Sequence, residues 1–128
     1  MRRNLEETRA YADKDRFAVY CDIVIDEVGE GYAKCHMDIK DHHRNARGVV
    51  MGGATFTLAD LCYGAACDFS AVSMTSEINY LAPATGDVLY AEAHVVKDGH
   101  ATVFYEVVVT DQNGRKVAFL TMTGFKSK

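Results

Sequence analysis

An isolated acid and a pair of glycines lie close together in the stretch NARGVVMGGATFTLADLCYGAA, residues 45–66. Between residues 48 and 67, Asp60 is the only charged residue. Because burial of an unpaired carboxylate is costly, such an acid must be paired, hydrated or protonated. An aspartate in apolar surroundings also has a raised pKa, as a general base often requires. Asp60 is therefore a candidate catalytic group, with a structural acid bonded to neighbouring hydroxyls as the alternative.

The glycine pair, Gly52 and Gly53, opens the apolar run that contains this acid. The first N–H groups of a helix have no intrahelical acceptor and lie at the positive end of the helix dipole. Glycine at these positions lets a ligand approach the backbone closely. The two amides could therefore polarise a substrate carbonyl as an oxyanion-type site. Alternatively, the glycines only allow a tight passage from loop to helix.

The spacing between the two features restricts how they can cooperate. If residues 53–68 form a helix, the eight residues from Gly52 to Asp60 correspond to about 12 Å along its axis. This separation is too large for both groups to act on one carbonyl. A site that uses both groups is therefore expected to be composite, with each group completed by residues from elsewhere.

The rest of the sequence predicts a short helix and six strands around this central helix. Residues 4–15 form a polar amphipathic pattern, and residues 17–40 predict two strands around the turn VGEG at 28–31. Period-two alternation supports the second of these strands, and residues 41–51 predict a polar loop. Turn pairs such as Asp-Gly and Asn-Gly separate four later strands. These four lie at residues 71–83, 88–97, 101–110 and 115–126.

This element order predicts an α+β fold in a single domain over residues 1–128. An antiparallel sheet must cover one face, and the central helix is the large apolar element available for that purpose. A helix that is apolar all round is typically buried. The expected structure is a curved six-stranded antiparallel sheet wrapped around one long central helix.

Composition and charge exclude several other classes. A membrane span of residues 48–67 is disfavoured by four glycines and the central acid, since Asp at the middle of a bilayer costs about 2.5–3.5 kcal/mol. The net charge of −4 gives no basic footprint for nucleic acid. The charged N-terminus lacks the apolar region of a signal peptide, so a cytoplasmic location is expected. The four cysteines have no CxxC spacing and predict reduced thiols rather than disulfides or zinc ligands.

The sequence also resembles a known family. HRNARGVVMGGATFTLAD, residues 43–60, resembles the signature H-x-N-x-x-G-x-x-H-G-G-x-x-x-x-L-x-D. This signature is typical of hotdog acyl-CoA thioesterases of the phenylacetate-pathway and 4-hydroxybenzoyl-CoA type. INYLAPATGDVL, residues 78–89, resembles a later strand and turn of the same family, and the similarity extends over roughly residues 17–125. The resemblance implies the hotdog fold. The matching signature positions are His43, Asn45, Gly48, Gly52, Gly53, Leu58 and Asp60.

The resemblance implies hydrolysis of acyl-CoA thioesters to the free acid and CoA, without a cofactor, at a site shared by two chains. Gly52 and Asn45 of one chain would act with Asp60 and Ser73 of the other. The helix amides would polarise the carbonyl, Asn45 would help hold water or the carbonyl, and Asp60 would serve as general base or as nucleophile. Gly53, Met51, Phe56 and Tyr63 are the expected substrate-binding residues. The expected assembly is a homodimer or a dimer of dimers, in line with apolar strand edges that a monomer would leave unpaired.

One departure from the signature supports an alternative function. Met51 stands where the family usually has histidine before the glycine pair. The backbone donors survive this change, but any hydrogen bond of the histidine is lost. The alternative is therefore a protein that binds or senses acyl thioesters and hydrolyses them poorly. The candidate partners for CoA phosphates are Arg44, Arg47, Lys97 and Lys116, each also compatible with an ordinary surface charge.

Other functional classes have less support. No histidine pair has metal-ligand spacing, so no metal is expected, and the absence of a G-x-S-x-G elbow argues against a serine hydrolase. A hotdog dehydratase or hydratase would need a catalytic histidine with an acid in another arrangement. A DNA-binding regulator would need an extension that the short mixed-charge N-terminal helix does not supply. A purely structural homo-oligomer remains the simplest alternative.

Overall fold

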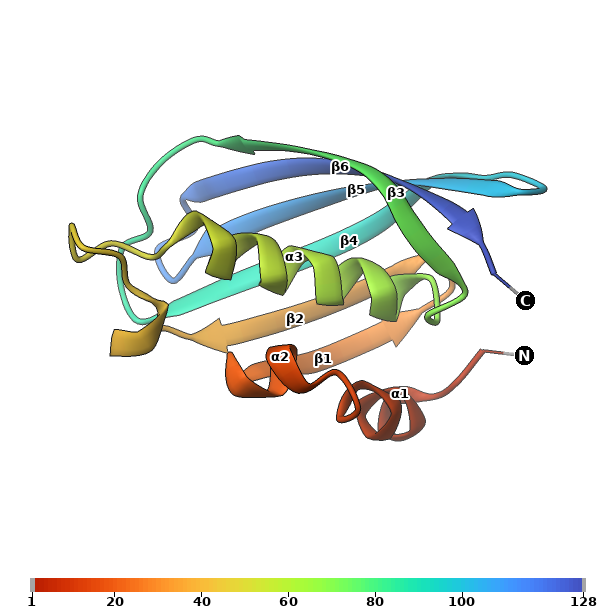
Figure 1. Cartoon of the computed structure of the whole chain (residues 1–128), viewed down its shortest axis with the longest axis horizontal. Coiled ribbons are helices and arrows are strands. Elements are labelled where there is room, and N and C mark those ends of the chain that lie inside the picture. The colour runs from red at the N-terminus through yellow and green to blue at the C-terminus, as the bar shows by residue number, and fades with distance from the viewer. Residues whose placement is uncertain (1, 128) are drawn as a thin grey trace.

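The computed structural model describes residues 2–127 as a strongly curved antiparallel sheet that wraps around one helix (Figure 1). Its six strands lie in the order β1-β2-β4-β5-β6-β3, and α3 crosses the concave face. This is the hotdog architecture that the sequence predicted. The strands are β1 (Ile23–Gly29), β2 (Tyr32–Asp38), β3 (Ala71–Tyr80), β4 (Val88–Asp98), β5 (Thr102–Asp111) and β6 (Lys116–Lys126).

The helices differ more from the prediction than the strands do. The central helix α3 (Gly52–Ala66) and the N-terminal helix α1 (Leu5–Ala12) are confirmed with slightly different ends. A capping box begins α1, because Asn4 Oδ1 accepts the Glu7 N–H at 2.8 Å and Glu7 Oε1 accepts the Asn4 N–H at 3.0 Å. A one-turn 3-10 helix (Asp41–His43) lies in the predicted loop.

The prediction of a strand beginning at Phe17 was wrong. Residues Arg16–Tyr20 form a short helix, α2, and the first strand begins only at Ile23. The apolar run FAVY has no helical period long enough to distinguish the two states. Packing decides the outcome: Ala18 is buried while Phe17 and Tyr20 on either side are exposed. Asp22, with φ of 65°, then reverses the chain into β1.

The core lies between α3 and the inner faces of the strands. Alternation in β2 buries Ala33, Cys35 and Met37, as the period-two pattern predicted. The inner residues of the helix are mostly small, which lets it pack closely into the curved sheet. All four cysteines are free thiols in this core. Within residues 2–127, no helix combines the length and apolar character needed to cross a bilayer.

Candidate active site

The loop that precedes α3 is held by a buried histidine. His43 is 2% exposed, and both of its ring nitrogens are engaged. The Lys40 N–H donates to Nδ1 at 2.9 Å, and Nε2–H donates to the carbonyl oxygen of Cys21 at 2.8 Å. These two bonds require a neutral ring with its proton on Nε2. Because the His43 carbonyl also accepts the Met51 N–H at 2.8 Å, this residue fixes the entry to α3.

Asn45 closes the turn at the tip of this loop. Its side-chain Oδ1 accepts the N–H groups of Arg47 at 2.9 Å and Val49 at 3.3 Å. Gly48 completes the turn with φ of 81°, a conformation that favours glycine. The amide oxygen of Asn45 is therefore used structurally, while its NH₂ group makes no hydrogen bond in the described part of the chain. That NH₂ group is the part of Asn45 left to bind a ligand.

The first turn of α3 presents two free backbone donors. The N–H groups of Ala54 and Thr55 donate to the Met51 carbonyl at 2.9 and 3.2 Å. Those of Gly52 and Gly53 have no acceptor within residues 2–127, and Met51 supplies no side-chain cap. Two donors at the positive end of a 15-residue helix suit an anionic or polarised oxygen. Both N–H groups that the sequence analysis assigns to an oxyanion-type site are therefore free of acceptors in the described residues.

The two glycines have different surroundings. A Cβ on Gly52 would lie 2.9 Å from the ring of Tyr80, whose hydroxyl donates to the Gly52 carbonyl at 3.0 Å. A Cβ on Gly53 would contact nothing within 4 Å. A side chain at Gly52 would thus displace the end of the exposed Tyr80 side chain, whereas one at Gly53 would displace nothing. Sequence reasoning missed Tyr80, because only the fold brings the end of β3 against the start of α3.

A cavity of about 440 Å³ adjoins this helix end. Most of its walls are aliphatic, and it runs from Gly52 and Tyr80 along the segment Leu81–Ala84. Pro83, one of the positions that resemble the family, contributes to the wall. The cavity therefore offers an apolar surface beside Gly52 at the start of α3.

Asp60 lies two turns further along α3 and is more exposed than the sequence predicted. The helix is not buried all round: Gly53 and Asp60 are exposed on its outer face, while Leu58 and Ala59 are buried. No hydrogen bond or ion pair in residues 2–127 engages the Asp60 carboxylate. Partial removal of water by the surrounding protein, and then the charge of Asp15, raise the pKa of this carboxyl group. An unpaired carboxylate with a raised pKa has the properties of a general base.

Ser73 lies on the helix-facing side of β3, although strict alternation along the strand would group it with Thr75, Glu77 and Asn79. A bulge between Ser73 and Thr75 shifts the register of β3 against β6. As a result Ser73 pairs with Gly124 and shares its face with Ser76 and Ile78 rather than with Thr75. The side chain is exposed in the protomer, at the sheet edge next to α3.

Two expected substrate-binding residues, Phe56 and Tyr63, lie at different depths. Phe56 is partly buried and packs against the hydrophobic core. Tyr63 is only 2% exposed, with its ring at 5.3 Å from that of Tyr105 in an edge-on arrangement. Its hydroxyl lies over Gly124 and has no hydrogen-bond partner in residues 2–127. Met51, in contrast, is 55% exposed beside the free N–H groups.

The four candidate cations separate into two groups. Arg44 and Arg47 lie in the loop before α3, and Lys116 begins β6 near the same end of the molecule (Figure 1). Lys97 belongs to the β4–β5 hairpin at the opposite end. The first three belong to segments at the end of the molecule where α3 begins. Arg44 additionally donates to the Gly48 carbonyl at 2.9 Å.

One group of side chains has the composition of a metal site. Potential ligand atoms of Asp22, His42 and His43 lie within 4.8 Å of one another. Because both ring nitrogens of His43 are already engaged, metal binding would require breaking the bonds that fix the loop. The arrangement therefore favours a structural role for this group.

The curved six-stranded antiparallel sheet wrapped around one long helix is the architecture of a hotdog protein. Residues 47–118 match the sequence profile of the Thioesterase superfamily. The chain is 33% identical to a putative esterase of Archaeoglobus fulgidus over 95% of this chain and 82% of the relative. It is 30% identical to the acyl-coenzyme A thioesterase PaaI of Escherichia coli over 88% and 84% of the two chains. The chain belongs to the Thioesterase superfamily.

Solved structures agree with this assignment. The PaaI protein from the phenylacetic acid degradation operon of E. coli superposes with a TM-score of 0.86 at 27% identity, covering 98% of this chain and 97% of that one. A hypothetical thioesterase from Streptococcus pneumoniae, solved with coenzyme A, superposes with a TM-score of 0.83 at 28% identity, covering 91% and 96%. The predicted fold and family are confirmed.

Proposed function

We propose that this protein hydrolyses acyl-CoA thioesters. The observation that carries the proposal is the pairing, on one helix, of two unbonded N–H groups at its start with an unpaired carboxylate two turns later. Thioester hydrolysis needs an electrophilic site for the carbonyl oxygen and a base or nucleophile on the other side. A relative named acyl-coenzyme A thioesterase and a structural neighbour that holds coenzyme A support acyl-CoA as the substrate class.

The proposed site is shared between two chains. Gly52 and Asp60 are about 12 Å apart along α3, so each needs a complement from elsewhere. The sheet edge formed by β3 is a suitable contact, because Val72 and Met74 are 64% and 59% exposed there and the strand has β6 as its one neighbour. An apolar unpaired edge of this kind is a template for pairing with a second strand. Pairing of two β3 edges would bring two copies of α3 side by side.

In this assembly, the N–H groups of Gly52 and Gly53 of one chain would hold the thioester carbonyl oxygen, with the Asn45 amide nearby. Asp60 of the other chain would act from the opposite side, close to Ser73 of its own chain. As general base, Asp60 takes a proton from water, the resulting hydroxide adds to the carbonyl carbon, and the C–S bond breaks to release CoA thiolate. As nucleophile, the Asp60 carboxylate instead attacks the carbonyl carbon, the C–S bond breaks to release CoA thiolate, and water cleaves the resulting mixed anhydride to the free acid and the restored carboxylate. Arg44 and Arg47 would contact the CoA phosphates.

A binding or sensing function is the second candidate, and Met51 is the observation that favours it. Its exposed thioether cannot donate a hydrogen bond to a substrate at the start of α3, as a histidine could. A carbonyl held by backbone amides alone would still bind. This candidate differs from the first in one measurable property, which is turnover.

Cleavage of a panel of aryl and aliphatic acyl-CoAs, followed by release of the CoA thiol, tests the proposal. Asp60→Asn should lower kcat by about 10²–10⁴, the range for loss of a general base. Glu27→Gln, an exposed change on β1, is the matched control and should leave turnover unchanged. Wild-type protein that binds acyl-CoA without turnover would replace the enzyme by the binder. Wild-type protein that neither binds nor cleaves any acyl-CoA would refute both.

Subunit mixing tests the shared site. Gly53→Pro removes one N–H donor in the first helical turn, where proline is tolerated. A dimer of one Gly53→Pro chain and one Asp60→Asn chain contains one site with both changes and one site with neither. Activity regained on mixing two inactive homodimers supports the shared site. Mixed dimers, verified by mass, that stay inactive would contradict it.

A further inference from the structure

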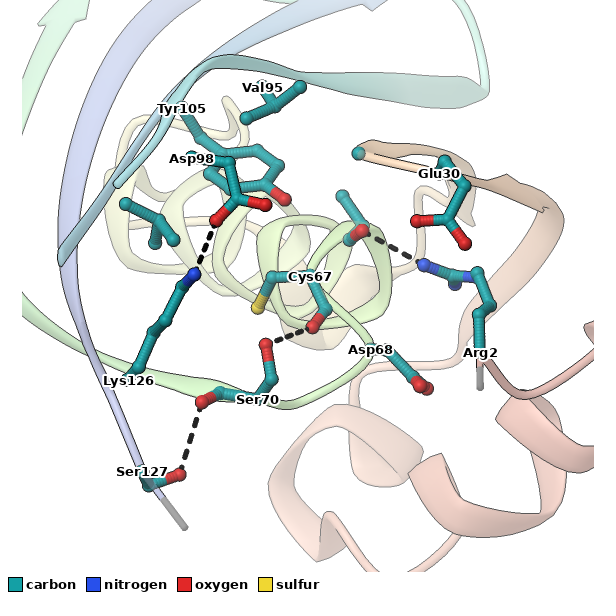
Figure 2. A pocket seen from close by; sticks show the side chains of 13 residues that line it. Arg2, Glu30, Cys67, Asp68, Ser70, Val95, Asp98, Tyr105, Lys126 and Ser127 are labelled. Atoms are coloured by element: carbon teal, nitrogen blue, oxygen red, sulfur yellow. Dashed lines mark hydrogen bonds and ion pairs between the residues drawn. The ribbon is translucent and has the colours of Figure 1, made fainter. Parts of the chain in front are cut away.

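The two ends of α3 are completed differently. At its C-terminal end, beside a cavity of about 540 Å³, Arg2 donates to the carbonyl oxygens of Ala65 and Ala66 (Figure 2). A positive charge therefore lies at the negative end of the helix dipole. At the N-terminal end no side chain caps the helix, and the N–H groups of Gly52 and Gly53 have no acceptor in residues 2–127. How strongly these two amides can bind a substrate oxygen depends on the groups that act on their peptide bonds.

Tyr80 acts on one of these amides through the peptide bond. Its hydroxyl donates to the Gly52 carbonyl oxygen at 3.0 Å. In a regular helix this oxygen also accepts the N–H four residues later, so Tyr80 supplies an additional bond. The Gly52 carbonyl belongs to the same planar peptide unit as the Gly53 N–H, and the two groups point in opposite directions. By holding the carbonyl, Tyr80 therefore also fixes the direction of the Gly53 N–H.

The same hydrogen bond makes the Gly53 N–H a stronger donor. Electron density drawn toward the carbonyl oxygen increases the double-bond character of the C–N bond and leaves the nitrogen more positive. Hydrogen bonds linked in a chain strengthen one another by about 10–30% each. Gly53 is exposed in the protomer, so the strengthened donor is one that a ligand can use. Tyr80, which is 55% exposed, lines the apolar cavity beside Gly52.

We propose that Tyr80 is a positioning residue for thioester hydrolysis, which orients and polarises the N–H of Gly53. The proposal rests on the proposed function and adds to it a residue outside the expected site. As water or Asp60 adds to the carbonyl carbon, negative charge develops on the carbonyl oxygen held by Gly53. The hydrogen-bond chain through the Gly52 carbonyl spreads part of this charge to the Tyr80 hydroxyl. Tyr80 keeps its proton and does not touch the substrate, so the bonds formed and broken are those described above.

The next peptide unit of the helix provides a matched control. Thr57 Oγ1 donates to the Gly53 carbonyl at 2.7 Å and so polarises the Ala54 N–H in the same way. That N–H already donates to the Met51 carbonyl at 2.9 Å and is not available to a substrate. Removal of either hydroxyl therefore deletes one side-chain bond at the start of α3. Of the two hydroxyls, only that of Tyr80 acts on a free N–H.

Kinetics of Tyr80→Phe and Thr57→Val test the proposal with the acyl-CoA that the wild type cleaves fastest. Loss of a whole oxyanion donor lowers kcat by about 10²–10³, and 10–30% of this effect on a logarithmic scale is about two- to eightfold. Tyr80→Phe should therefore lower kcat about two- to eightfold with KM nearly unchanged, whereas Thr57→Val should keep the wild-type kcat. Replacement of Tyr80 by 3-fluorotyrosine, a stronger donor, should raise kcat above wild type at a pH where the phenol stays protonated. An unchanged kcat in Tyr80→Phe, or equal losses in both variants, would overturn the proposal.

The carbonyl stretch of a bound thioester gives a readout that a merely structural role of Tyr80 would not move. It is measured by infrared difference spectroscopy of ¹³C-labelled acyl-CoA bound to Asp60→Asn, with and without each of the two changes. Tyr80→Phe should raise the stretching frequency, because a weaker donor polarises the carbonyl less, and Thr57→Val should leave it in place. Wild-type turnover together with an unshifted frequency in Tyr80→Phe would overturn this proposal alone. Wild-type protein that neither binds nor cleaves acyl-CoA would refute the proposed function and this proposal with it.

Discussion

The contact between Tyr63 and Gly124 gives the sharpest test of how α3 packs on the sheet. A Cβ added at Gly124 would overlap the Tyr63 hydroxyl and would also lie 3.1 Å from Val103 Cγ2 and 3.2 Å from the Cβ of Ala71. All four residues are buried, so no neighbour can move into solvent. Overpacking of this kind costs about 1–3 kcal/mol. Gly124→Ala should therefore destabilise the protein by about 2 kcal/mol, despite the better strand propensity of alanine.

Removal of the Tyr63 hydroxyl should instead stabilise the protein. Tyr63→Phe removes a buried hydroxyl that has no hydrogen-bond partner within residues 2–127. Because an unpaired buried hydroxyl costs about 1–3 kcal/mol and its removal leaves a void of only one atom, this variant should gain about 1 kcal/mol. In the double variant, the space left by the hydroxyl accepts the new methyl group. The two changes should therefore couple favourably by at least about 1 kcal/mol.

Chemical denaturation of the four proteins in the cycle measures these values. At equal m-values, the midpoint should move down for Gly124→Ala, up for Tyr63→Phe, and back toward wild type for the pair. Gly53→Ala, where an added Cβ meets nothing within 4 Å, is the control for the effect of glycine removal itself. A coupling energy near zero would refute the contact between Tyr63 and Gly124. A Tyr63→Phe variant less stable than wild type would show that the Tyr63 hydroxyl has a hydrogen-bond partner.

Three further predictions concern the site and the pH response. Gly52→Ala should lower both stability and turnover, because the added Cβ meets the Tyr80 ring at 2.9 Å. Gly53→Ala should lower turnover but raise the melting temperature, because alanine favours a helix more than glycine does. Melting curves and kcat values of the two variants check both expectations. Asp60→Asn should raise the melting temperature at pH 7. The pKa of the Asp60 carboxyl is raised in the folded protein, so its ionisation destabilises the fold as the pH rises through that pKa. The gain from the variant should therefore vanish below pH ~4, the ordinary pKa of aspartate. Asp111 should act with the opposite sign: burial opposes its ionisation, but hydrogen bonds from Thr85, Arg115 and Asn113 prevail and lower its pKa to about 2. Ionised Asp111 should therefore stabilise the folded protein by about 2 kcal/mol above pH ~4, and this contribution should be lost as the pH falls toward 2. The contribution should be absent in Asp111→Asn. The unfolding free energy of both proteins, measured across the acidic pH range, checks this.

Much of the fold was predictable because its signals are local. Turn glycines mark the hairpins, and Gly31 and Gly114 indeed adopt φ of 64° and 80°. Alternation in β2 identified its buried face. The segment Arg16–Tyr20 was not predictable in this way, since its four apolar and aromatic residues fit a strand or a helix equally well. Its state depends on Ala18 packing under neighbours that are distant in sequence.

The residues of the candidate site remain a prediction, and their positions in the fold were only partly predictable from the sequence. The positions of Gly52 and Asp60 on one helix follow from spacing alone. The orientation of Ser73 does not, because a bulge changes the parity of β3 and no local pattern marks it. Tyr80 was missed for a similar reason: its contact with Gly52 joins two elements that are 28 residues apart.

The departures from good helix design in α3 coincide with the proposed chemistry. The helix begins without a side-chain cap, has glycine at its first two positions and carries one unpaired acid on its outer face. Each feature weakens a helix, and the buried side, with Leu58, Leu61 and Cys62 against the sheet, shows no comparable defect. Packing explains Gly52 through Tyr80 but gives no reason for Gly53 or Asp60. Local rules are broken most often where function requires it, so these two unexplained positions support a site on the outer face of α3, completed by a second chain.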